Sequence, residues 1–372
     1  MGTDTGQYTS SSLYETLADR IRVSIHKGTY QPGDLIGSEH GLARQENISR
    51  MTVRRASEVL INEGLIERRP GKGLYVRSGQ VGTQTIQVVA GNLQWETSLQ
   101  IARGVQHAAH RNGVQVQLYD AHGDMSLDLN MMRRLPDSAI QGAIIISVHN
   151  PAFSEAVFDL KIRGFPFVLV DQSLRDIEVP SVVADNYGGG YAAGKELLGL
   201  GHRRIAFLGN LAAVTVQDRL AGLRDAIGDA GLAFDRALVA DLQTSEDPLG
   251  DWSEQVVQNT GRLMGQASPP SAVFCSCDAV ARACYRALAQ MELKIPQNVS
   301  IIGFDDDPLA EWLTPALTTV HQPFQEMGQA AMELLSRQIA NPRTPAERRV
   351  LPTTLVQRAS TARAGALVPS SV

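Results

Sequence analysis

Two arginines four residues apart are the residues of this 372-residue sequence best suited to a defined chemistry. Arg50 and Arg54 lie in the segment SRMTVRRA, and positions i and i+4 of a helix project from the same face. A guanidinium group can donate two hydrogen bonds to O6 and N7 of guanine, which discriminates that base by about 1–3 kcal/mol. The spacing therefore indicates a recognition helix for the major groove of DNA.

Small polar and basic residues nearby fit the same chemistry. Ser49 and Thr52 can bind phosphate beside the N-terminus of this helix. Lys72, between Gly71 and Gly73, can contact phosphate or enter the minor groove. A solvated basic face on an ordinary helical subdomain would carry the same charges, so charge alone leaves that interpretation open.

The elements around these residues follow from apolar spacing and capping residues. Leu13, Leu17, Ile21 and Ile25 give one apolar helix face, and Ser12 with Glu15 has capping-box spacing. Glycines and a Pro-Gly turn separate the later segments. We expect helices over 12–27, 38–43 and 49–63 and strands over 65–68 and 74–76. Three helices followed by a small hairpin predict a winged helix-turn-helix.

Charge is distributed unevenly along the chain. Residues 13–77 contain eleven Lys or Arg against eight Asp or Glu, whereas the whole chain has a net charge of −5. A basic module on an acidic body favours a nucleic-acid reader joined to a separate sensor. Three cysteines, no apolar run of about 18 residues and no signal-peptide pattern predict a cytoplasmic protein without a membrane contact.

From Ile86 the pattern changes to short β-branched runs that alternate with helical stretches. This alternation predicts an α/β fold with parallel sheets and a ligand site at the carboxyl ends of the strands, in one sheet or in two lobes. The expected strands are 86–91, 114–120, 142–148, 166–172, 204–209, 271–276 and 299–305. The expected helices are 98–112, 126–135, 151–164, 187–200, 217–230, 254–266, 279–291 and 324–340.

The amino-acid sequence of the N-terminal segment resembles that of the GntR-type DNA-binding domain over about 65 residues. The matching elements are PGD (32–34), SRMTVRRA (49–56), EGLIERRPGKG (63–73) and the closing Tyr75-Val76. The resemblance implies base or phosphate contacts from the third helix and the wing, and His40 stands where the family usually has Arg. The expected DNA-contacting residues are Ser49, Arg50, Thr52, Arg54, Arg55, Glu39, His40, Gly71 and Lys72.

Residues 86–361 resemble the effector domain of LacI-type (lactose and galactose repressor) regulators, a periplasmic-binding-protein-like fold. The matching sequence segments include ADNYGGGYAAGKELLGLGHRRIAFLG (184–209), IPQNVSIIGFDDD (295–307) and LPTTLVQRAST (351–361). The joint arrangement looks like the arabinose-repressor-type subgroup of the GntR family. It implies lobe 1 at about 86–183 and 323–350 and lobe 2 at about 184–320 and 351–361. We expect disorder at 1–11 and 362–372 and a linker at 78–85, which leaves 12–77 for the winged helix-turn-helix.

The resemblance also implies a site for a small sugar, whose hydroxyls suit Asp, Asn and Arg and whose apolar face suits an aromatic plate. Arg219 matches the arginine that grips ligand hydroxyls, and Asp305 matches the first Asp of the G-F/Y-D-D turn. Asp185 is expected to cap a helix instead, with Asp306 and Asp307 as helix-cap and surface residues. The expected effector-binding residues are Asn92, Trp95, Ser147, Asp171, Arg219, Trp252, Cys277, Asp305 and Phe324.

Cys277 stands where the family commonly has Asn, and cysteine cannot make an amide's paired hydrogen bonds. This departure keeps a second hypothesis open, in which the effector is a nucleobase or another non-sugar metabolite. A third hypothesis, a solute-binding protein for transport, is disfavoured by the DNA-binding segment. The main hypothesis is a repressor that binds palindromic half-sites of double-stranded DNA as a homodimer.

Catalytic and metal-binding patterns are missing from the sequence. Cys275-x-Cys277 with Cys284 lacks paired C-x2-C spacing, so three reduced thiols are the better interpretation. The Gly188-Gly189-Gly190 run has no Lys-Ser/Thr at Walker spacing, and close backbone packing explains it better. Neither a Gly-x-Ser-x-Gly elbow nor an HExxH motif occurs. We therefore expect no enzyme, no cofactor and no metal.

Overall fold

A computed structural model describes residues 10–26, 29–31, 33–62, 65–76, 84–146, 151–174, 177–242 and 253–365. The packing divides the chain into two compact units with the boundary between Thr85 and Ile86, except that residues 112–115 group with the first unit. Among the described helices, no span combines the length and the apolar character that crossing a membrane requires. Each unit has its own hydrophobic core.

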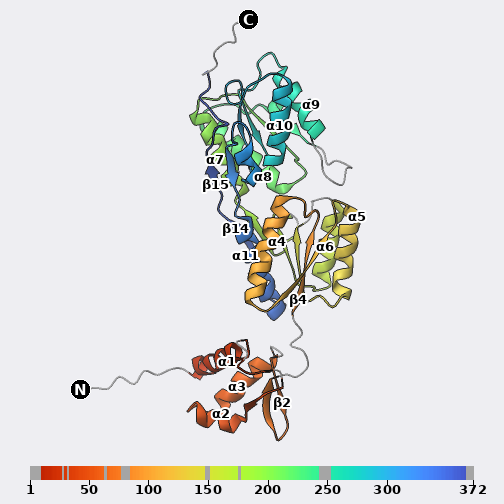
Figure 1. Cartoon of the computed structure of the whole chain (residues 1–372), viewed down its shortest axis with the longest axis vertical. Helices are drawn as coiled ribbons and strands as arrows, with labels where there is room; N and C mark the ends of the chain where they lie inside the picture. Colours follow the sequence, from red (N-terminus) through yellow and green to blue (C-terminus); the bar gives the residue numbers. More distant parts are fainter. Residues whose placement is uncertain are drawn as a thin grey trace, which may run out of the picture. The chain divides into compact units, whose positions relative to one another are not determined.

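The N-terminal unit consists of three helices and a small antiparallel sheet (Figure 1). The sheet order is β1-β3-β2. Leu17, Val53, Leu60 and Leu74 are buried in its core. This arrangement confirms the predicted winged helix-turn-helix. Its elements are α1 (Ser10–His26), β1 (Leu35–Gly37), α2 (Glu39–Gln45), α3 (Arg50–Asn62), β2 (Ile66–Arg69) and β3 (Gly73–Val76).

Serine side chains begin the second and third helices, as the sequence predicts. Ser38 Oγ accepts a hydrogen bond from the Gly41 N–H at 2.9 Å, and Ser49 Oγ accepts one from the Thr52 N–H at 3.1 Å. The first helix starts at Ser10, two residues before the expected start at Ser12 and within the segment 1–11 that was expected to be disordered. The short strand β1 was not predicted, because three residues carry no readable alternation.

The first lobe of the C-terminal unit is built on a six-stranded sheet with the order β14-β8-β7-β6-β4-β5. Figure 1 shows α4 beside α11 and α5 beside α6, and α11 packs on β6, β7 and β8. The strands are β4 (Thr85–Ala90), β5 (Gln115–Asp120), β6 (Ala143–Ile146), β7 (Phe167–Val170), β8 (Ser181–Ala184) and β14 (Arg348–Leu351). The helices are α4 (Glu96–Arg111), α5 (Met125–Arg134), α6 (Pro151–Ile162) and α11 (Phe324–Ala340), with a 3-10 turn at Leu135–Asp137.

The second lobe has a four-stranded parallel sheet with the order β10-β9-β11-β12 and a two-stranded sheet of β13 and β15. The strands are β9 (Ile205–Gly209), β10 (Val239–Asp241), β11 (Ala272–Cys275), β12 (Ser300–Ile302), β13 (Thr319–His321) and β15 (Thr354–Val356). The helices are α7 (Asn186–Gly199), α8 (Val214–Asp229), α9 (Ser253–Met264) and α10 (Asp278–Gln290), with 3-10 segments at Arg236–Leu238 and Pro308–Trp312.

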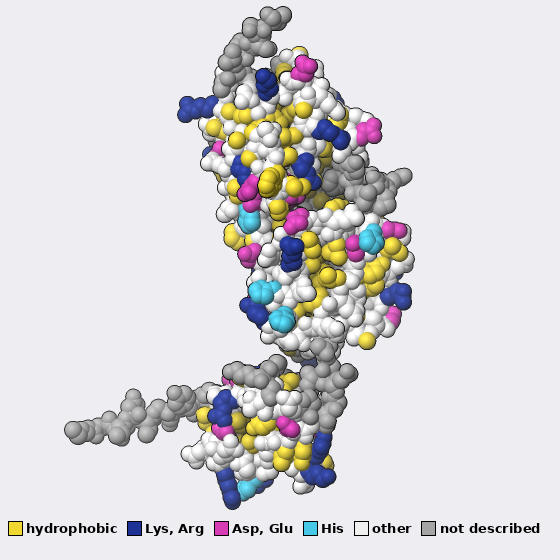
Figure 2. Space-filling view, viewed as in Figure 1, with side chains coloured by type: hydrophobic (Ala, Val, Ile, Leu, Met, Phe, Trp, Pro, Cys, Tyr) yellow, Lys and Arg dark blue, Asp and Glu magenta, His cyan; other side chains and the backbone are white. Residues whose placement is uncertain are grey.

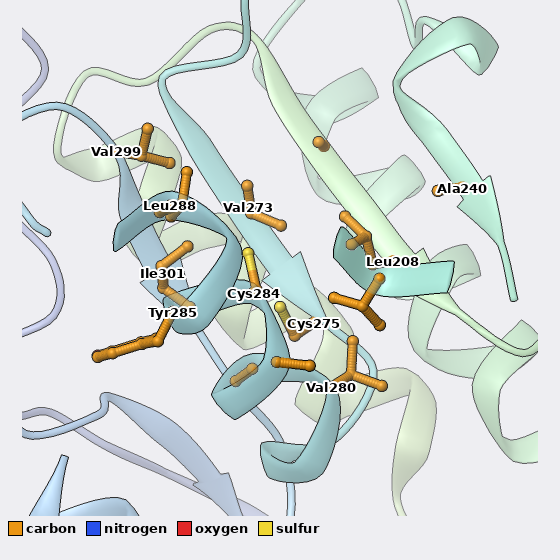
Figure 3. Close-up of a cluster of buried hydrophobic side chains, with 14 of the residues drawn as sticks. Leu208, Ala240, Val273, Cys275, Val280, Cys284, Tyr285, Leu288, Val299 and Ile301 are labelled. Atoms are coloured by element: carbon orange, nitrogen blue, oxygen red, sulfur yellow. The ribbon is translucent and has the colours of Figure 1, made fainter. Parts of the chain in front are cut away.

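The core of the second lobe contains two of the three cysteines. Figure 3 shows Cys275 of β11 facing Cys284 of α10, among Val273, Leu288 and other apolar side chains. All three cysteines are free thiols, and Cys275 and Cys284 are buried. Packing of this kind stabilises the fold by about 1.5–3 kcal/mol for each large apolar side chain removed from water.

A buried histidine fixes the C-terminal segment to the second lobe. His202 contacts Ser271 Oγ through Nδ1 at 2.8 Å and the Ala362 carbonyl oxygen through Nε2 at 3.0 Å. The Ala364 N–H donates to the Leu200 carbonyl oxygen at 2.9 Å. Burial lowers the pKa of His202, which favours the neutral ring. Residues 362–365 of the segment that was expected to be disordered thus lie against the second lobe, and the rest of that segment lies outside the described residues.

Five strands of the C-terminal unit were not predicted: β8, β10, β13, β14 and β15. The seven expected strands and the eight expected helices all occur, with ends that differ by a few residues. A 3-10 segment, Pro308–Trp312, follows Asp307. Most of the expected linker, 77–83, lies outside the described residues, and Thr85 already belongs to β4.

Candidate functional site

The exposed face of α3 carries three arginines. Arg50, Arg54 and Arg55 are all exposed, and Arg54 Nε lies 3.2 Å from Glu58 Oε1 one turn further along. Thr52 differs from them, since it is 7% exposed and its hydroxyl lies 2.7 Å from Ser49 Oγ. The helix therefore presents guanidinium groups outward, while the Ser49–Thr52 pair holds its first turn.

The wing and α2 add further groups to the N-terminal unit. Lys72 and Gly71 are exposed at the tip of the β2–β3 turn, where Gly71 has φ +71°. Gly73 has φ +118°, and a Cβ there would lie 2.8 Å from the Gly37 carbonyl oxygen, so this turn requires glycine. Glu39 pairs with Arg68, whereas His40 is exposed. Figure 2 shows Lys and Arg side chains at the lower edge of this unit.

Arg219 in the C-terminal unit is held from four sides. It is 4% exposed; its Nε donates to Asn186 Oδ1 at 2.7 Å and its Nη1 to the Ser276 carbonyl oxygen at 2.5 Å. The guanidinium carbon lies 3.8 Å from the centre of the Phe304 ring, and Nη1 lies 3.8 Å from Asp305 Oδ1. These contacts fix the side chain before any ligand arrives.

Close packing of two helices places Arg219 in this position. A Cβ on Gly190 of α7 would lie 2.1 Å from the Arg219 carbonyl oxygen, and one on Gly222 of α8 would lie 2.2 Å from the Tyr187 carbonyl oxygen. The glycine run of α7 thus serves backbone packing, as the sequence predicts. Asp185 caps α7 by accepting the Gly188 N–H at 2.8 Å, which confirms its expected structural role.

Two carboxyl groups lie near Arg219, one from each lobe. Asp305 follows β12, and its Oδ1 accepts the Gln322 amide at 2.7 Å. Asp171 follows β7, and its Oδ1 is shielded from solvent without a hydrogen-bond partner among the described residues. Burial raises the pKa of Asp171 to about 6, although the nearby Arg219 charge lowers it. Burial also raises the pKa of Asp305 well above its usual range, and the Asp171 charge adds to this.

Two residues of this site were missed by sequence reasoning. Asp278, 1% exposed at the start of α10, accepts hydrogen bonds from Thr319 Oγ1 at 2.6 Å and from the Asp307 N–H at 2.8 Å. Burial raises its pKa to about 7, although those hydrogen bonds lower it. Gln322 is 1% exposed and lies in the segment between β13 and α11, where no sequence pattern marks it as a site residue. The position of Asp278, three residues after the end of the buried strand β11, would have identified it.

The other expected effector residues are more scattered. Burial raises the pKa of the Cys277 thiol to about 12, and the Asp305 charge adds to this. Asn92 is 1% exposed and accepts the Gln94 N–H at 2.8 Å, and Trp95 is half-buried just beyond it. Phe324 is buried at the start of α11. Ser147 and Trp252 lie outside the described residues. The assignment of these residues to an effector remains a prediction.

Asp306 and Asp307 have structural partners, as expected. Asp306 pairs with Arg358 at 2.7 Å and with His321 at 3.1 Å, and Asp307 accepts the Leu309 N–H at 2.8 Å. Within the described ranges, His, Cys, Asp and Glu side chains form no cluster that would suit a metal ion.

Comparison with known sequences finds two families that match separate parts of the chain. The bacterial regulatory proteins of the gntR family match residues 13–76, and the periplasmic binding protein-like domain matches residues 195–361. The ribose operon repressor of Haemophilus influenzae is 30% identical over 262 residues, 70% of this chain and 76% of that protein. The arabinose metabolism transcriptional repressor of Halalkalibacterium halodurans is 25% identical over 335 residues, 87% of this chain and 88% of that protein.

Solved structures agree with these sequence matches. A LacI family transcriptional regulator from Enterococcus faecium, crystallised with bound ribose, superposes with a TM-score of 0.63 at 29% identity. The match covers 75% of this chain and 99% of that one. The similarity therefore covers the sensor part of the chain in both sequence and fold.

Proposed function

This chain belongs to the family of bacterial transcriptional repressors with a periplasmic-binding-protein-like effector domain, here joined to a gntR-family DNA-binding domain, and we propose that a small sugar controls its binding to operator DNA. The observation that carries the proposal is the meeting of Arg219, Asp305 and Asp171 at strand ends of two lobes. Guanidinium and carboxylate groups suit sugar hydroxyls, and a similar regulator was crystallised with ribose.

The effector site is tested by calorimetry with a panel of pentoses, hexoses and polyols. Arg219→Ala removes the fixed guanidinium, and we expect it to weaken binding of the effector at least tenfold. Arg224→Ala is the control, because Arg224 lies one turn further along α8, is exposed and pairs with Asp225. If Arg219→Ala and the wild-type protein bind the effector equally well, the proposed site is wrong. Nucleobases in the same panel test the non-sugar hypothesis that Cys277 motivates.

We propose that α3 and the wing read the operator. The exposure of Arg50 and Arg54 on one helix face supports this role. We expect Arg54→Ala to weaken specific binding by about 1–3 kcal/mol and to relax the preference for one base pair, as measured by gel shift. Arg224→Ala again serves as the control, because it removes a positive charge from the other unit. An unchanged affinity for Arg54→Ala would exclude this recognition helix.

We further propose that the protein acts as a homodimer on palindromic DNA, in the cytoplasm and without catalytic activity. Two recognition helices match two half-sites about one helical turn apart only in a dimer. The exposed apolar pair Leu309 and Trp312 at the Pro308–Trp312 segment supports a protein interface, since their side chains are 53% and 82% exposed. The effector then changes the affinity of the protein for DNA by the same factor by which its own affinity differs between the DNA-bound and the DNA-free protein.

A further inference from the structure

An apolar side chain lies exposed on the helix that we propose reads DNA. Met51 lies in the first turn of α3 and is 64% exposed, whereas Val53 and Leu60 of the same helix are buried. The hydrogen bonds and charge contacts proposed for α3 make no use of this side chain. Removal of a methionine side chain from water is favourable, so a partner that covers Met51 gains affinity from it.

Helix geometry places Met51 among the arginines of the exposed face. Positions i, i+3 and i+4 lie on one side of a helix, so Met51 shares its side with Arg54 and Arg55, and all three are exposed. Thr52 is turned the other way, since it is 7% exposed and its hydroxyl lies 2.7 Å from Ser49 Oγ. The N-terminal residues of a recognition helix are those that reach base edges. Met51 is therefore an apolar group at the end of α3 that would enter the major groove.

The charges around Met51 select the kind of partner that can cover it. Arg50, Arg54 and Arg55 carry three positive charges on this surface, and Glu58 offsets one of them by pairing with Arg54 at 3.2 Å. A second copy of the same surface would bring like charges together and is disfavoured. DNA supplies negative phosphates for the arginines, and the 5-methyl group of thymine is an apolar group on the base edges of its major groove. A thymine edge therefore matches both the charge and the apolar character of this surface.

We propose that Met51 contacts the 5-methyl group of a thymine in each half-site and so adds a T·A preference to the guanine contacts that we expect from the arginines. This inference rests on the proposed function, because it specifies one base that the same helix recognises. The unbranched methionine side chain has three rotatable bonds and can reach the methyl group without a shift of the helix. Burial of one methyl-sized group changes affinity about fourfold, so Met51 sets a preference for T·A rather than an absolute requirement.

The first experiment removes the methyl group from the DNA and leaves the protein unchanged. Operator sequences are selected from random duplexes with the full-length protein, and each thymine is then replaced by deoxyuridine, one position at a time. We expect deoxyuridine at one position of a half-site to weaken binding about fourfold in a gel shift, and at both symmetric positions about fifteenfold. If no duplex is selected, the proposed DNA-binding function itself is wrong. If duplexes are selected and no deoxyuridine weakens binding, the thymine contact is wrong and the DNA-binding function stands.

The second experiment assigns the methyl contact to Met51 by combining protein and DNA changes. Met51→Gln keeps the length of the side chain and its helix propensity but makes its end polar, and Met51→Ala removes the side chain beyond Cβ. We expect both variants to bind the thymine and deoxyuridine operators with equal affinity. Met51→Leu should retain most of the discrimination, because its side chain remains apolar.

The control for these variants is Val23→Ala, which changes an exposed apolar residue of another helix. Val23 lies on α1 and is 49% exposed, so its replacement should leave the ratio of thymine to deoxyuridine affinity unchanged. Melting temperatures verify that each variant folds. A ratio that stays at the wild-type value in folded Met51→Gln or Met51→Ala contradicts the assignment of the contact to Met51.

Discussion

At the scale of single residues, the proposed effector site contains groups that destabilise the fold. Asp171 follows β7 with φ +57°, a backbone conformation that is uncommon for a residue other than glycine. Its carboxyl group is buried, and one of its oxygens has no partner among the described residues. Strained and desolvated groups of this kind concentrate at functional sites, where the ligand supplies what the fold leaves unsatisfied.

We therefore expect Asp171→Asn to stabilise the ligand-free protein at neutral pH. The pKa of Asp171 is about 6 in the folded state and 3.8 for the free group. Between these two pH values the carboxyl group is ionised in the unfolded chain but mostly protonated in the folded protein. The contribution of this group to the unfolding free energy falls as the pH rises from about 4 to 6, by about 3 kcal/mol in total. Differential scanning calorimetry should show a higher melting temperature for the variant at pH 7.5.

The control for this measurement is Asp229→Asn, which changes an exposed carboxyl group. The increase in melting temperature caused by Asp171→Asn should be smaller at pH 4.5, because the wild-type carboxyl group is then mostly protonated in the folded protein. A gain of equal size at both pH values would show that burial of charge is not its cause.

Sequence patterns identified some of these residues and not others. Asp171, Arg219 and Asp305 were predicted from strand ends and motif positions, and the structure brings their charges together. Gln322 was missed because it lies in a short irregular segment. Only the folded chain brings it next to Asp305. A glutamine in an irregular segment carries no periodicity from which its neighbours can be inferred.

At the scale of elements, the contact between α7 and α8 sets the geometry of the effector site. The two helices approach so closely that glycine is required at Gly190 and Gly222, and Arg219 lies on the same stretch of α8. A change in the spacing of these helices would therefore shift the guanidinium group relative to Asp305.

We expect Gly190→Ala to destabilise the C-terminal unit by about 1–3 kcal/mol and to weaken effector binding, because its Cβ would lie 2.1 Å from the Arg219 carbonyl oxygen. Chemical denaturation and calorimetry measure the two effects. Gly228→Ala in α8 is the control, since nothing lies within 4 Å of its Cβ. Alanine there should be neutral or stabilise by up to about 1 kcal/mol. Equal stability of the two variants would refute the close-packing argument.

The helices were predicted well, whereas several of the short strands were missed. All eight α-helices in the described part of the C-terminal unit were expected, since each spans enough turns to show an apolar face. The missed strands β10, β13, β14 and β15 have three or four residues and gain their partners only from distant parts of the chain. Strand β8 is also short: it has four residues, all of them buried.

At the scale of the whole molecule, the proposed binding of palindromic DNA requires two copies of the chain. Trp312 is 82% exposed, which is unusual for the largest apolar side chain, and it lies in a short segment directly after the effector-site turn. An interface there would lie close in sequence to Asp305 and Asp307, so effector binding and subunit contact would share one loop.

We expect Trp312→Glu to lower the fraction of dimer and to weaken operator binding, because a charge replaces the centre of the proposed interface. Light scattering gives the oligomeric state, and gel shift gives the DNA affinity. Ile162→Glu is the control, since Ile162 on α6 is also exposed, at 68%. If both variants remain dimeric, the interface lies elsewhere.

The order in which the strands occur along the chain also bears on biosynthesis. The first lobe receives its edge strand β14 from residues 348–351, and the second receives β15 from residues 354–356. A ribosome must therefore translate as far as residue 351 before the first sheet is complete and as far as residue 356 before β13 has its partner, whereas the winged helix is finished by residue 76. A nascent or prematurely terminated chain would hold a folded DNA reader before it had any means to respond to the effector.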